Sequence, residues 1–271
     1  MADTQQIPGL ASRFEIRKLS DNDVLWASAI LSFTNCLYSP VWSVVYPDNQ
    51  VKRVYDSTEA TAFLLHQVGP ELSYGVFDKE YDFKRSESKA TGGKLYWDYS
   101  NLNATKEELL EQMDFPLVSV ALSYDGFKEL SLEQLKPLVD CKPLLGTLYA
   151  VLEVRDKRDP ETWKAKNYGE VLLRCGTSTR VDYENRGIMK ATAHFLMRDM
   201  AAKGFRAIQL GTSHSKVDHV WMNPPEPFKA NRVSEIDPQT YEEEKDGVKY
   251  KPFAATQQMM TKIYLTLTPT E

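Results

Sequence analysis

The sequence has few cysteines and none of the spacings in which cysteine usually performs chemistry. Its 271 residues contain three, Cys36, Cys141 and Cys175, which lie far apart and form no CxxC pair. An odd, scattered set of this kind is typical of reduced thiols in an intracellular protein. Cys175 falls inside an apolar stretch, where a cysteine is more often a small core residue than a nucleophile.

Long apolar runs and an excess of basic residues are also missing. No run approaches the roughly 18 residues needed to cross a bilayer, and the opening residues 1–12 lack the charged and apolar regions of a secretory signal. The 33 Lys and Arg residues are outnumbered by 38 Asp and Glu residues, which gives a net charge of −5. A nucleic-acid-binding domain is typically basic. We therefore expect a cytoplasmic protein that binds neither nucleic acid nor membrane.

The common catalytic signatures are absent as well. The sequence contains no GxGxxG after a strand, no GxxxxGK[ST], no HExxH, no GxSxG and no kinase signature set. The four histidines, His66, His194, His214 and His219, are not spaced with carboxylates as a metal site requires, so no metal is expected. His66 and His194 fall on expected helices and are interpreted as structural.

What is present is the composition of an ordinary globular protein, with 42% hydrophobic residues, 13 glycines and 14 prolines. We find no internal repeat and no linker. The sequence therefore predicts one α/β domain over residues 1–271, with an irregular insertion near 80–110.

The pattern of apolar residues predicts a sheet of about seven strands with helices between them. Strands are expected near 14–18, 72–77, 116–124, 170–181, 205–210, 228–236 and 259–267. Helices are expected near 24–37, 41–46, 58–68, 131–141, 187–203 and 216–222. The apolar run 143–154 fits a helix or a strand equally well, whereas the polar stretch 80–105 and the acidic stretch 241–246 are expected to be loops.

The clearest local pattern is a strand, a turn, a helix and a second strand between residues 170 and 210. Met189, Ala193, Leu196 and Met200 recur at spacings of 4, 3 and 4, which is typical of one apolar helix face. Gly204 stands where a helix usually stops. Such a βαβ unit places the two strands parallel in a buried sheet.

The turn in this unit, residues 184–187, suits a phosphate group. A glycine at a strand-to-helix turn lets the first amides of the helix face an anion, and Arg186 and Lys190 add positive charge beside Gly187. Between residues 180 and 206, six basic residues outnumber three acidic ones, which gives a local charge of +3. The alternative interpretation is an ordinary turn with scattered surface charges.

The order of these elements and two motifs resemble the GCN5-related N-acetyltransferase (GNAT) superfamily. The motifs are VDYENRGIMKA at 181–191 and AKGFRAI at 202–208. The resemblance covers roughly 14–46, 72–77, 116–124 and 169–222. It implies a single-domain fold with a mixed central sheet, splayed between the strands near 171–181 and 205–211, and with helices on both faces.

The resemblance also implies that acetyl-CoA binds between those two strands. Backbone groups near Arg180 and Val181 would pair with the pantetheine arm. The amides expected to hold the pyrophosphate belong to Arg186, Gly187, Ile188, Met189, Lys190 and Ala191. Two places depart from the usual Q/R-x-x-G-x-G/A loop, because Glu184 holds the first position and Met189 the last glycine.

The chemistry implied is direct attack of a neutral amine on the thioester, which needs a base for the ammonium proton and an acid for the leaving thiolate. Trp221 stands where many members of the superfamily have the acidic tyrosine, and an indole cannot give up a proton in this way. Candidates for these roles are Glu184, His214, Asp218, His219 and Tyr183. His214 is preferred because it follows the strand end and titrates near neutral pH; otherwise it is a solvent-facing loop residue.

Trp42 and Tyr46 lie where the superfamily's first two helices line the acceptor pocket, and they, with Trp221, are expected to contact the acceptor unless they only fill the core. The leading hypothesis is an acetyl-CoA-dependent N-acetyltransferase acting on a small-molecule amine, as a monomer or homodimer. The alternative is a degenerate protein of the same fold that binds CoA or another ligand without turnover. An unrelated α/β scaffold is the third and weakest hypothesis.

Overall fold

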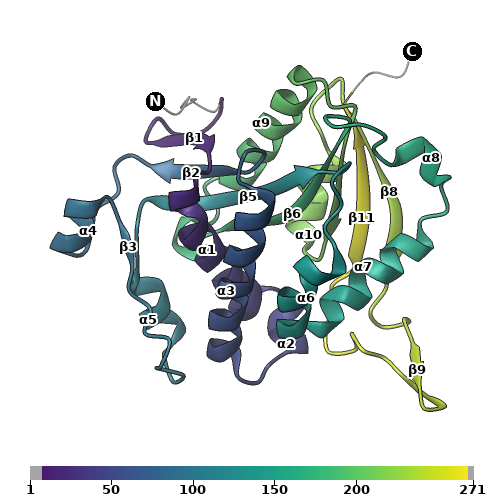
Figure 1. The fold of residues 1–271 in the computed structure, drawn as a ribbon, viewed down its shortest axis with the longest axis horizontal. Helices are drawn as coiled ribbons and strands as arrows, with labels where there is room; N and C mark the ends of the chain where they lie inside the picture. The colour runs from purple at the N-terminus through teal and green to yellow at the C-terminus, as the bar shows by residue number, and fades with distance from the viewer. Residues whose placement is uncertain (1–7, 268–271) are drawn as a thin grey trace. The chain divides into compact units, whose positions relative to one another are not determined.

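A computed structural model of the chain describes residues 8–267 and has an α/β architecture. Its main sheet has seven strands in the order β1-β2-β5-β6-β7-β11-β8 (Figure 1). These strands are β1 Phe14–Lys18, β2 Tyr74–Asp78, β5 Leu117–Asp125, β6 Val171–Thr179, β7 Ala207–Thr212, β8 Lys229–Ile236 and β11 Met260–Thr266. The helices are α1 Val24–Tyr38, α2 Trp42–Val45, α3 Gln50–Val68, α6 Leu132–Cys141, α7 Pro143–Arg155, α8 Pro160–Trp163, α9 Ile188–Ala202 and α10 Ser215–Met222.

The sheet is mixed, as the sequence predicts. Strands β6 and β7 run parallel with α9 between them in the chain, whereas β1, β2, β8 and β11 make antiparallel ladders. The β6–β7 ladder pairs Val171–Arg174 with Ala207–Leu210, although both strands continue beyond it. The fold class expected from the sequence is confirmed.

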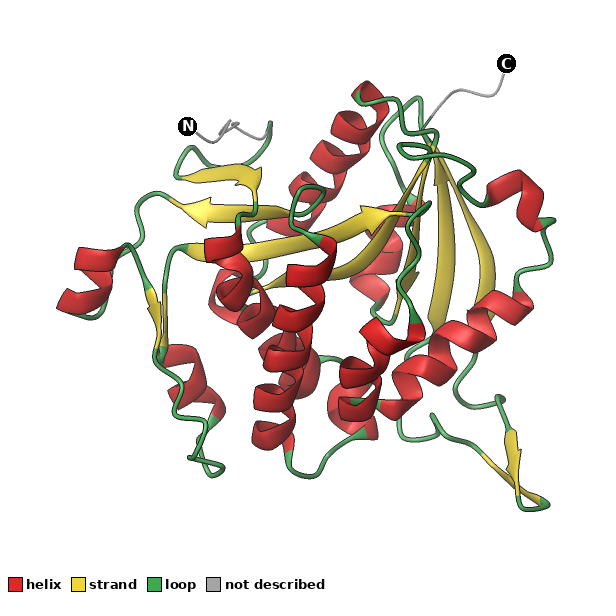
Figure 2. Cartoon of the chain, viewed as in Figure 1, coloured by secondary structure: helices red, strands yellow, loops and turns green. Residues whose placement is uncertain are grey.

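The chain packs into two compact units, each built from several segments. The first unit comprises residues 1–38, 48–122 and 176–192. In it, the antiparallel pair β1–β2 joins β5, and helices α1 and α3 pack side by side (Figure 2). The expectation of a single domain stays a prediction.

The second unit comprises residues 39–47, 123–175 and 193–271. Helix α7 packs on strands β8 and β11, and its Leu148 and Leu152 join Trp42, Phe253 and others in a buried cluster. Because 143–154 lies in α7, the run that the sequence left open is a helix.

Two stretches expected to be loops contain regular structure. The insertion forms helices α4 Ser86–Thr91 and α5 Lys106–Glu111 and a small pair of strands, β3 Lys94–Leu95 and β4 Met113–Asp114. Thr105 caps α5 through its side chain, which accepts from the Glu108 amide. The acidic stretch is half of a hairpin, β9 Glu243–Lys245 with β10 Val248–Tyr250, turning at Asp246 and Gly247. Short polar elements of this kind carry little apolar periodicity, so pattern alone misses them.

Within residues 8–267, no helix is long and apolar enough to cross a membrane. Within residues 8–267 the three cysteines form no disulfide; Cys36 is buried and the other two are half-buried.

A buried cation, Lys262 of β11, ties α7 to the sheet. Its ammonium lies 2.7 Å from Glu153 and 3.0 Å from Asp156, at the end of the helix. Burial raises the pKa of Asp156, but hydrogen bonds from Arg158 and Lys262 outweigh it and lower the pKa to about 2. The Asp156 carboxylate is therefore charged in the folded protein at neutral pH.

We expect Asp156→Asn to lower the free energy of unfolding at pH 7 by about 2 kcal/mol, as the depressed pKa implies. A carboxylate with a depressed folded-state pKa stabilises above its unfolded value and loses that effect as pH falls through the folded value. The wild-type unfolding free energy should therefore drop between about pH 4 and pH 2 more steeply than that of the variant. Urea denaturation across this range measures both. Asp140→Asn is the matched control because Asp140 is paired only on the surface with Lys136, and a loss equal to that of Asp156→Asn would contradict the prediction.

Candidate functional site

The turn that leads from β6 into α9 is fastened by Arg180, which is 1% exposed. Its guanidinium donates to the Phe115 carbonyl at 3.0 Å and to the Asp182 carboxylate at 2.8 Å. Its backbone amide donates to Val118, and its carbonyl accepts from Tyr183. Both polar backbone groups are thus engaged within the chain, and the predicted contact of Arg180 with a pantetheine arm stays a prediction without support from this geometry.

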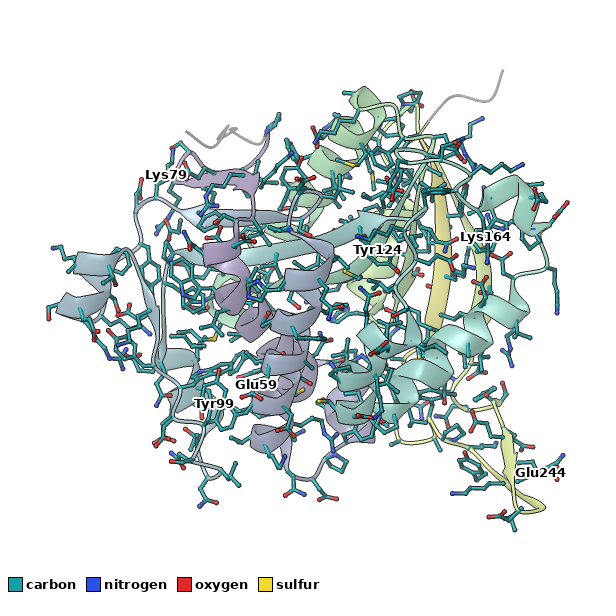
Figure 3. All side chains as sticks on the ribbon, in the orientation of Figure 1. Glu59, Lys79, Tyr99, Tyr124, Lys164 and Glu244 are labelled. Carbon is teal, nitrogen blue, oxygen red and sulfur yellow. The ribbon has the colours of Figure 1, made fainter. Side chains whose placement is uncertain are left out.

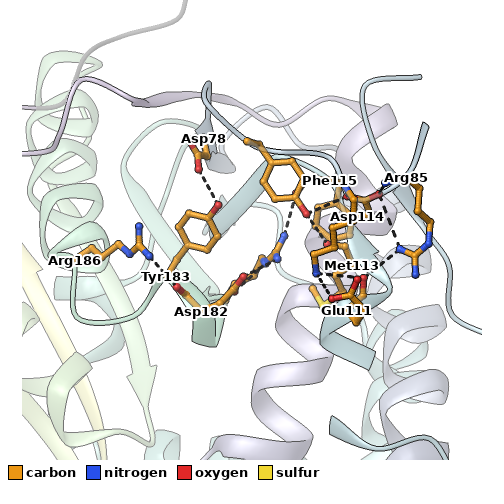
Figure 4. A network of polar contacts seen from close by, with 12 residues as sticks. Asp78, Arg85, Glu111, Met113, Asp114, Phe115, Asp182, Tyr183 and Arg186 are labelled. Atoms are coloured by element: carbon orange, nitrogen blue, oxygen red, sulfur yellow. Dashed lines mark hydrogen bonds and ion pairs between the residues drawn. The ribbon is translucent and has the colours of Figure 1, made fainter. Parts of the chain in front are cut away.

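Tyr183 fastens the same turn to the first two strands. Its hydroxyl donates to Asp78 at 2.8 Å (Figure 4), and Arg13 also bonds to that carboxylate. Burial raises the pKa of Asp78, but the bonds from Arg13 and Tyr183 outweigh it and lower the pKa, whereas burial and the carboxylate together raise the pKa of Tyr183. Tyr183, one of the candidate acids, is therefore committed to a structural hydrogen bond.

The loop after Tyr183 contains two residues with positive φ and leads into the start of α9. Asn185 and Gly187 both adopt positive φ, 61° and 75°, on either side of Arg186. A Cβ at Gly187 would meet no heavy atom within 4 Å, so the space beside it is open. The first internal bond of α9 runs from the Ala191 amide to the Gly187 carbonyl. The amides of 188–190 therefore have no acceptor inside the helix and can receive an anion.

The charges at this loop are fewer than the sequence suggests. Arg180 is neutralised by Asp182, while Lys203 and Arg206 pair with Asp199 and Glu170. Two exposed cations of the predicted phosphate site lie at the loop and the first turn of α9, Arg186 and Lys190. Arg186 lies 4.8 Å from the Tyr183 ring centroid and donates to the Asp182 carbonyl, so the same network holds it (Figure 4). Glu184 is exposed at the start of the loop.

In the second unit, His214 is the N-cap of α10. Its Nδ1 accepts from the Lys216 amide at 3.1 Å, and its own amide donates to Thr212. Because Nδ1 is an acceptor in this bond, the neutral ring carries its proton on Nε2. Protonation at Nδ1 would break the cap. The ring is thus arranged as a hydrogen-bond donor from Nε2.

The other candidates on α10 differ sharply in their surroundings. Asp218 accepts from Arg232 and from Thr261, both at 2.7 Å, so its carboxylate is engaged. His219 is exposed and contacts Asn223. Trp221 is 1% exposed, and among the described residues its Nε1 has no hydrogen-bond partner.

The two aromatic residues expected in the acceptor pocket are packed together. Trp42 is 4% exposed within the core cluster and stacks on Tyr46 at 6.4 Å. The Tyr46 hydroxyl accepts from the Leu144 amide at 2.7 Å. Both side chains thus have a structural role, and their contact with an acceptor stays a prediction.

No protein-family model matches the sequence, and no curated protein sequence matches it. Solved structures do match. The C-terminal condensation domain of Ebony, in complex with beta-alanyl-dopamine, aligns at a TM-score of 0.58 and 14% identity, over 92% of this chain and 97% of that chain. Arylalkylamine N-acetyltransferase 2 from Aedes aegypti aligns at 0.57 and 11%, over 95% and 100%. A polyamine N-acetyltransferase from Drosophila melanogaster aligns at 0.51 and 8%, over 93% and 98%.

These alignments span nearly the whole length of each chain. Together with the mixed seven-strand sheet and the βαβ unit, they establish that this chain has the GNAT fold. At such low identity the likeness concerns the fold and leaves the residues of the site to be argued from this chain.

Sequence reasoning missed the residues that hold the loop in place. Arg13 and Asp78 lie far from the loop in the chain, and no local pattern connects them to Tyr183. The only available signal was Asp78, a charge at the end of the largely apolar strand β2, since a buried charge requires a partner.

We expect Tyr183→Phe to lower the free energy of unfolding by about 1 kcal/mol, because it removes one buried hydrogen bond and leaves the ring in place. Chemical denaturation measures the loss. Tyr38→Phe is the matched control, since Tyr38 is half-exposed and its hydroxyl makes no hydrogen bond recorded among residues 8–267. Equal stability of the wild type and Tyr183→Phe would show that the bond to Asp78 does not secure the turn.

Proposed function

We propose that the protein is an acetyl-CoA-dependent N-acetyltransferase that acylates a small-molecule amine. The observation that carries this proposal is the start of α9, where free amides, the open space beside Gly187 and the exposed Arg186 and Lys190 come together. The fold adds support, because it is that of structures described as N-acetyltransferases.

The residues at this turn fit the pyrophosphate of CoA. A phosphate placed over Gly187 would meet no side chain there, and the amides of 188–190 offer donors. The helix dipole and two cations favour negative charge at this point. Glu184 opposes it, so its carboxylate has to point away from the phosphates or serve the acceptor.

Bound acetyl-CoA supplies an activated thioester, and the chain must supply proton transfer. His214 and Glu184 are the proposed catalytic residues. Because Nδ1 accepts from the Lys216 amide, the neutral ring carries its proton on Nε2, and a donor of this kind suits hydrogen bonding to a carbonyl oxygen that becomes negative. Glu184 is exposed and can accept a proton from an ammonium.

The acceptor class follows from the fold's relatives only as a proposal. The structures that this chain resembles are described as acting on arylalkylamines and polyamines, and one holds beta-alanyl-dopamine. A small amine is therefore the proposed acceptor, taken up by a monomer or homodimer.

One observation favours the alternative, a protein that binds CoA without turnover. Trp221 is fully buried at the place of the expected acid, and Met189 replaces a glycine in the loop. This alternative predicts stabilisation by CoA but no release of CoA thiol with any amine, whereas the leading proposal predicts both.

We expect acetyl-CoA at about 100 times its dissociation constant to stabilise the wild type by about 2.7 kcal/mol, which is a readily measured rise in melting temperature. Gly187→Trp should abolish the rise because the indole would fill the open space beside the helix start. Gly187→Ala is the matched control, since it shares the strain of a side chain at φ 75° without the bulk. A melting temperature of the wild type that does not respond to acetyl-CoA would refute the proposal, and a full response of Gly187→Trp would refute the loop assignment.

We expect His214→Asn to lower kcat by about 100-fold or more, while the KM for acetyl-CoA stays near that of the wild type. Asparagine can still cap α10, so the variant removes the imidazole and keeps the helix start. Steady-state thiol release measures kcat. His214→Ala removes both and should also lower the free energy of unfolding by about 1 kcal/mol. An unchanged kcat in His214→Asn would limit His214 to its structural role.

A further inference from the structure

Tyr149 of α7 lies against the sheet where the β6–β7 ladder ends. A Cβ added to Gly211 of β7 would be 3.0 Å from Cε1 of the Tyr149 ring. Burial, and then the neighbouring Cys175 of β6, raise the pKa of Tyr149 to about 12. Cys175 is the residue that follows the last ladder pair, Arg174 with Leu210. The ring therefore faces the point at which the two strands stop pairing.

The face of the sheet that Tyr149 covers is opposite to the face of Trp221. Side chains alternate along a strand, and the guanidinium of Arg174 lies 5.8 Å over the Trp221 ring. The next residue, Cys175, therefore points to the face of Tyr149. The indole that replaces the expected acid and the phenol of Tyr149 thus flank the same end of the ladder from its two faces.

The Tyr149 side chain is only partly covered by the protein. The residue is 45% exposed, although its ring lies against Gly211. No hydrogen bond of this hydroxyl is recorded within residues 8–267. The phenol keeps its proton at neutral pH, and its raised pKa makes it a weak acid that gives the proton to sulfur only as it takes up another.

Two neighbours share the environment of Tyr149 but are less suited to proton transfer to a substrate. Tyr124, at the carboxyl end of β5 (Figure 3), has its pKa raised by burial and then by Cys175 and Tyr149. Burial also raises the pKa of the Cys175 thiol to about 11, and a thiol is a weak hydrogen-bond donor. Of the three, Tyr149 is the most exposed.

We propose that Tyr149 is a catalytic residue that passes a proton from the acceptor nitrogen to the leaving sulfur, the task that Trp221 cannot perform. The inference rests on the proposed N-acetyltransferase function. As the nitrogen–carbon bond forms and the carbon–sulfur bond breaks, the electron pair of that bond goes to sulfur. The phenol proton moves to the sulfur, and a proton from the nitrogen moves to the phenol oxygen. The products are the amide and the free thiol, and Tyr149 ends as it began.

A binding experiment tests the contact without any turnover. Wild type and Tyr149→Phe are titrated with CoA and with desulfo-CoA, which lacks the thiol. If the hydroxyl contacts the sulfur, the wild type should bind CoA about 3–10-fold more tightly than desulfo-CoA, the value of one hydrogen bond. Tyr149→Phe should bind the two ligands equally. The same preference in both proteins would overturn the proposed contact.

A kinetic experiment tests the proton transfer. Tyr149→Phe should lower kcat by about 100-fold with the KM for acetyl-CoA changed less than about twofold. Tyr168→Phe is the matched control in the same unit, because Tyr168 is 68% exposed and stacks edge-on with Phe127. A kcat of Tyr149→Phe within about twofold of the wild type would overturn the inference while leaving the proposed function standing. A wild type that binds neither CoA nor desulfo-CoA would overturn both.

Discussion

The buried guanidinium of Arg180 is the constraint on which the proposed phosphate site depends. A charge with 1% exposure is tolerated only when its donors are satisfied, and Arg180 satisfies them on Phe115 and Asp182. Because an unpaired buried guanidinium would be costly, the Phe115 carbonyl and the Asp182 carboxylate are both held in place by Arg180. Because Asp182 lies two residues before Glu184, the direction in which the chain enters the loop follows from this bond.

In the other unit a second buried ion cluster, around Lys262, likewise fixes the position of a neighbouring segment. Lys262 holds Glu153 and Asp156, and Glu153 is four residues, about one helical turn, beyond Tyr149. Fixing Glu153 on β11 therefore sets the rotation of α7, so that Tyr149 packs on Gly211. In each unit an ion pair that is expensive to break positions a neighbouring group of proposed function, and neither ion pair belongs to the reaction itself.

The elements with strong periodicity could be predicted from the sequence. The stripe of Met189, Ala193, Leu196 and Met200 defined α9, and alternation defined β1, because burial on one face imposes a period on the residues. Strand β11 was also found from alternating apolar residues, although the structure buries it on both faces. The start of α3 at Gln50, eight residues before the expected one, was missed although Val51, Val54 and Tyr55 already follow helical spacing.

Only those parts of the candidate site that lie within one short stretch of the sequence could be predicted. Gly187 and Arg186 stand in one turn, and their conformation follows from the glycine and its neighbours. The capping role of His214 depends on the rotamer that brings Nδ1 to the Lys216 amide, which no sequence pattern reports. The bond between Tyr183 and Asp78 joins residues 105 positions apart, so only the folded chain shows it.

In the proposed mechanism the acid is Tyr149, which lies on the face of the sheet opposite to that of Trp221. A buried indole at Trp221 can pack and can donate one hydrogen bond, but it has no proton to give. The phenol of Tyr149 lies on the face that α7 covers, and its raised pKa keeps the proton in place at neutral pH. A thiolate is a weaker base than this phenolate, so the transfer to sulfur requires that the phenol oxygen take up the proton of the nitrogen as the sulfur leaves. Gly211 makes the arrangement possible, because any side chain at that position would push the ring away from the strand end.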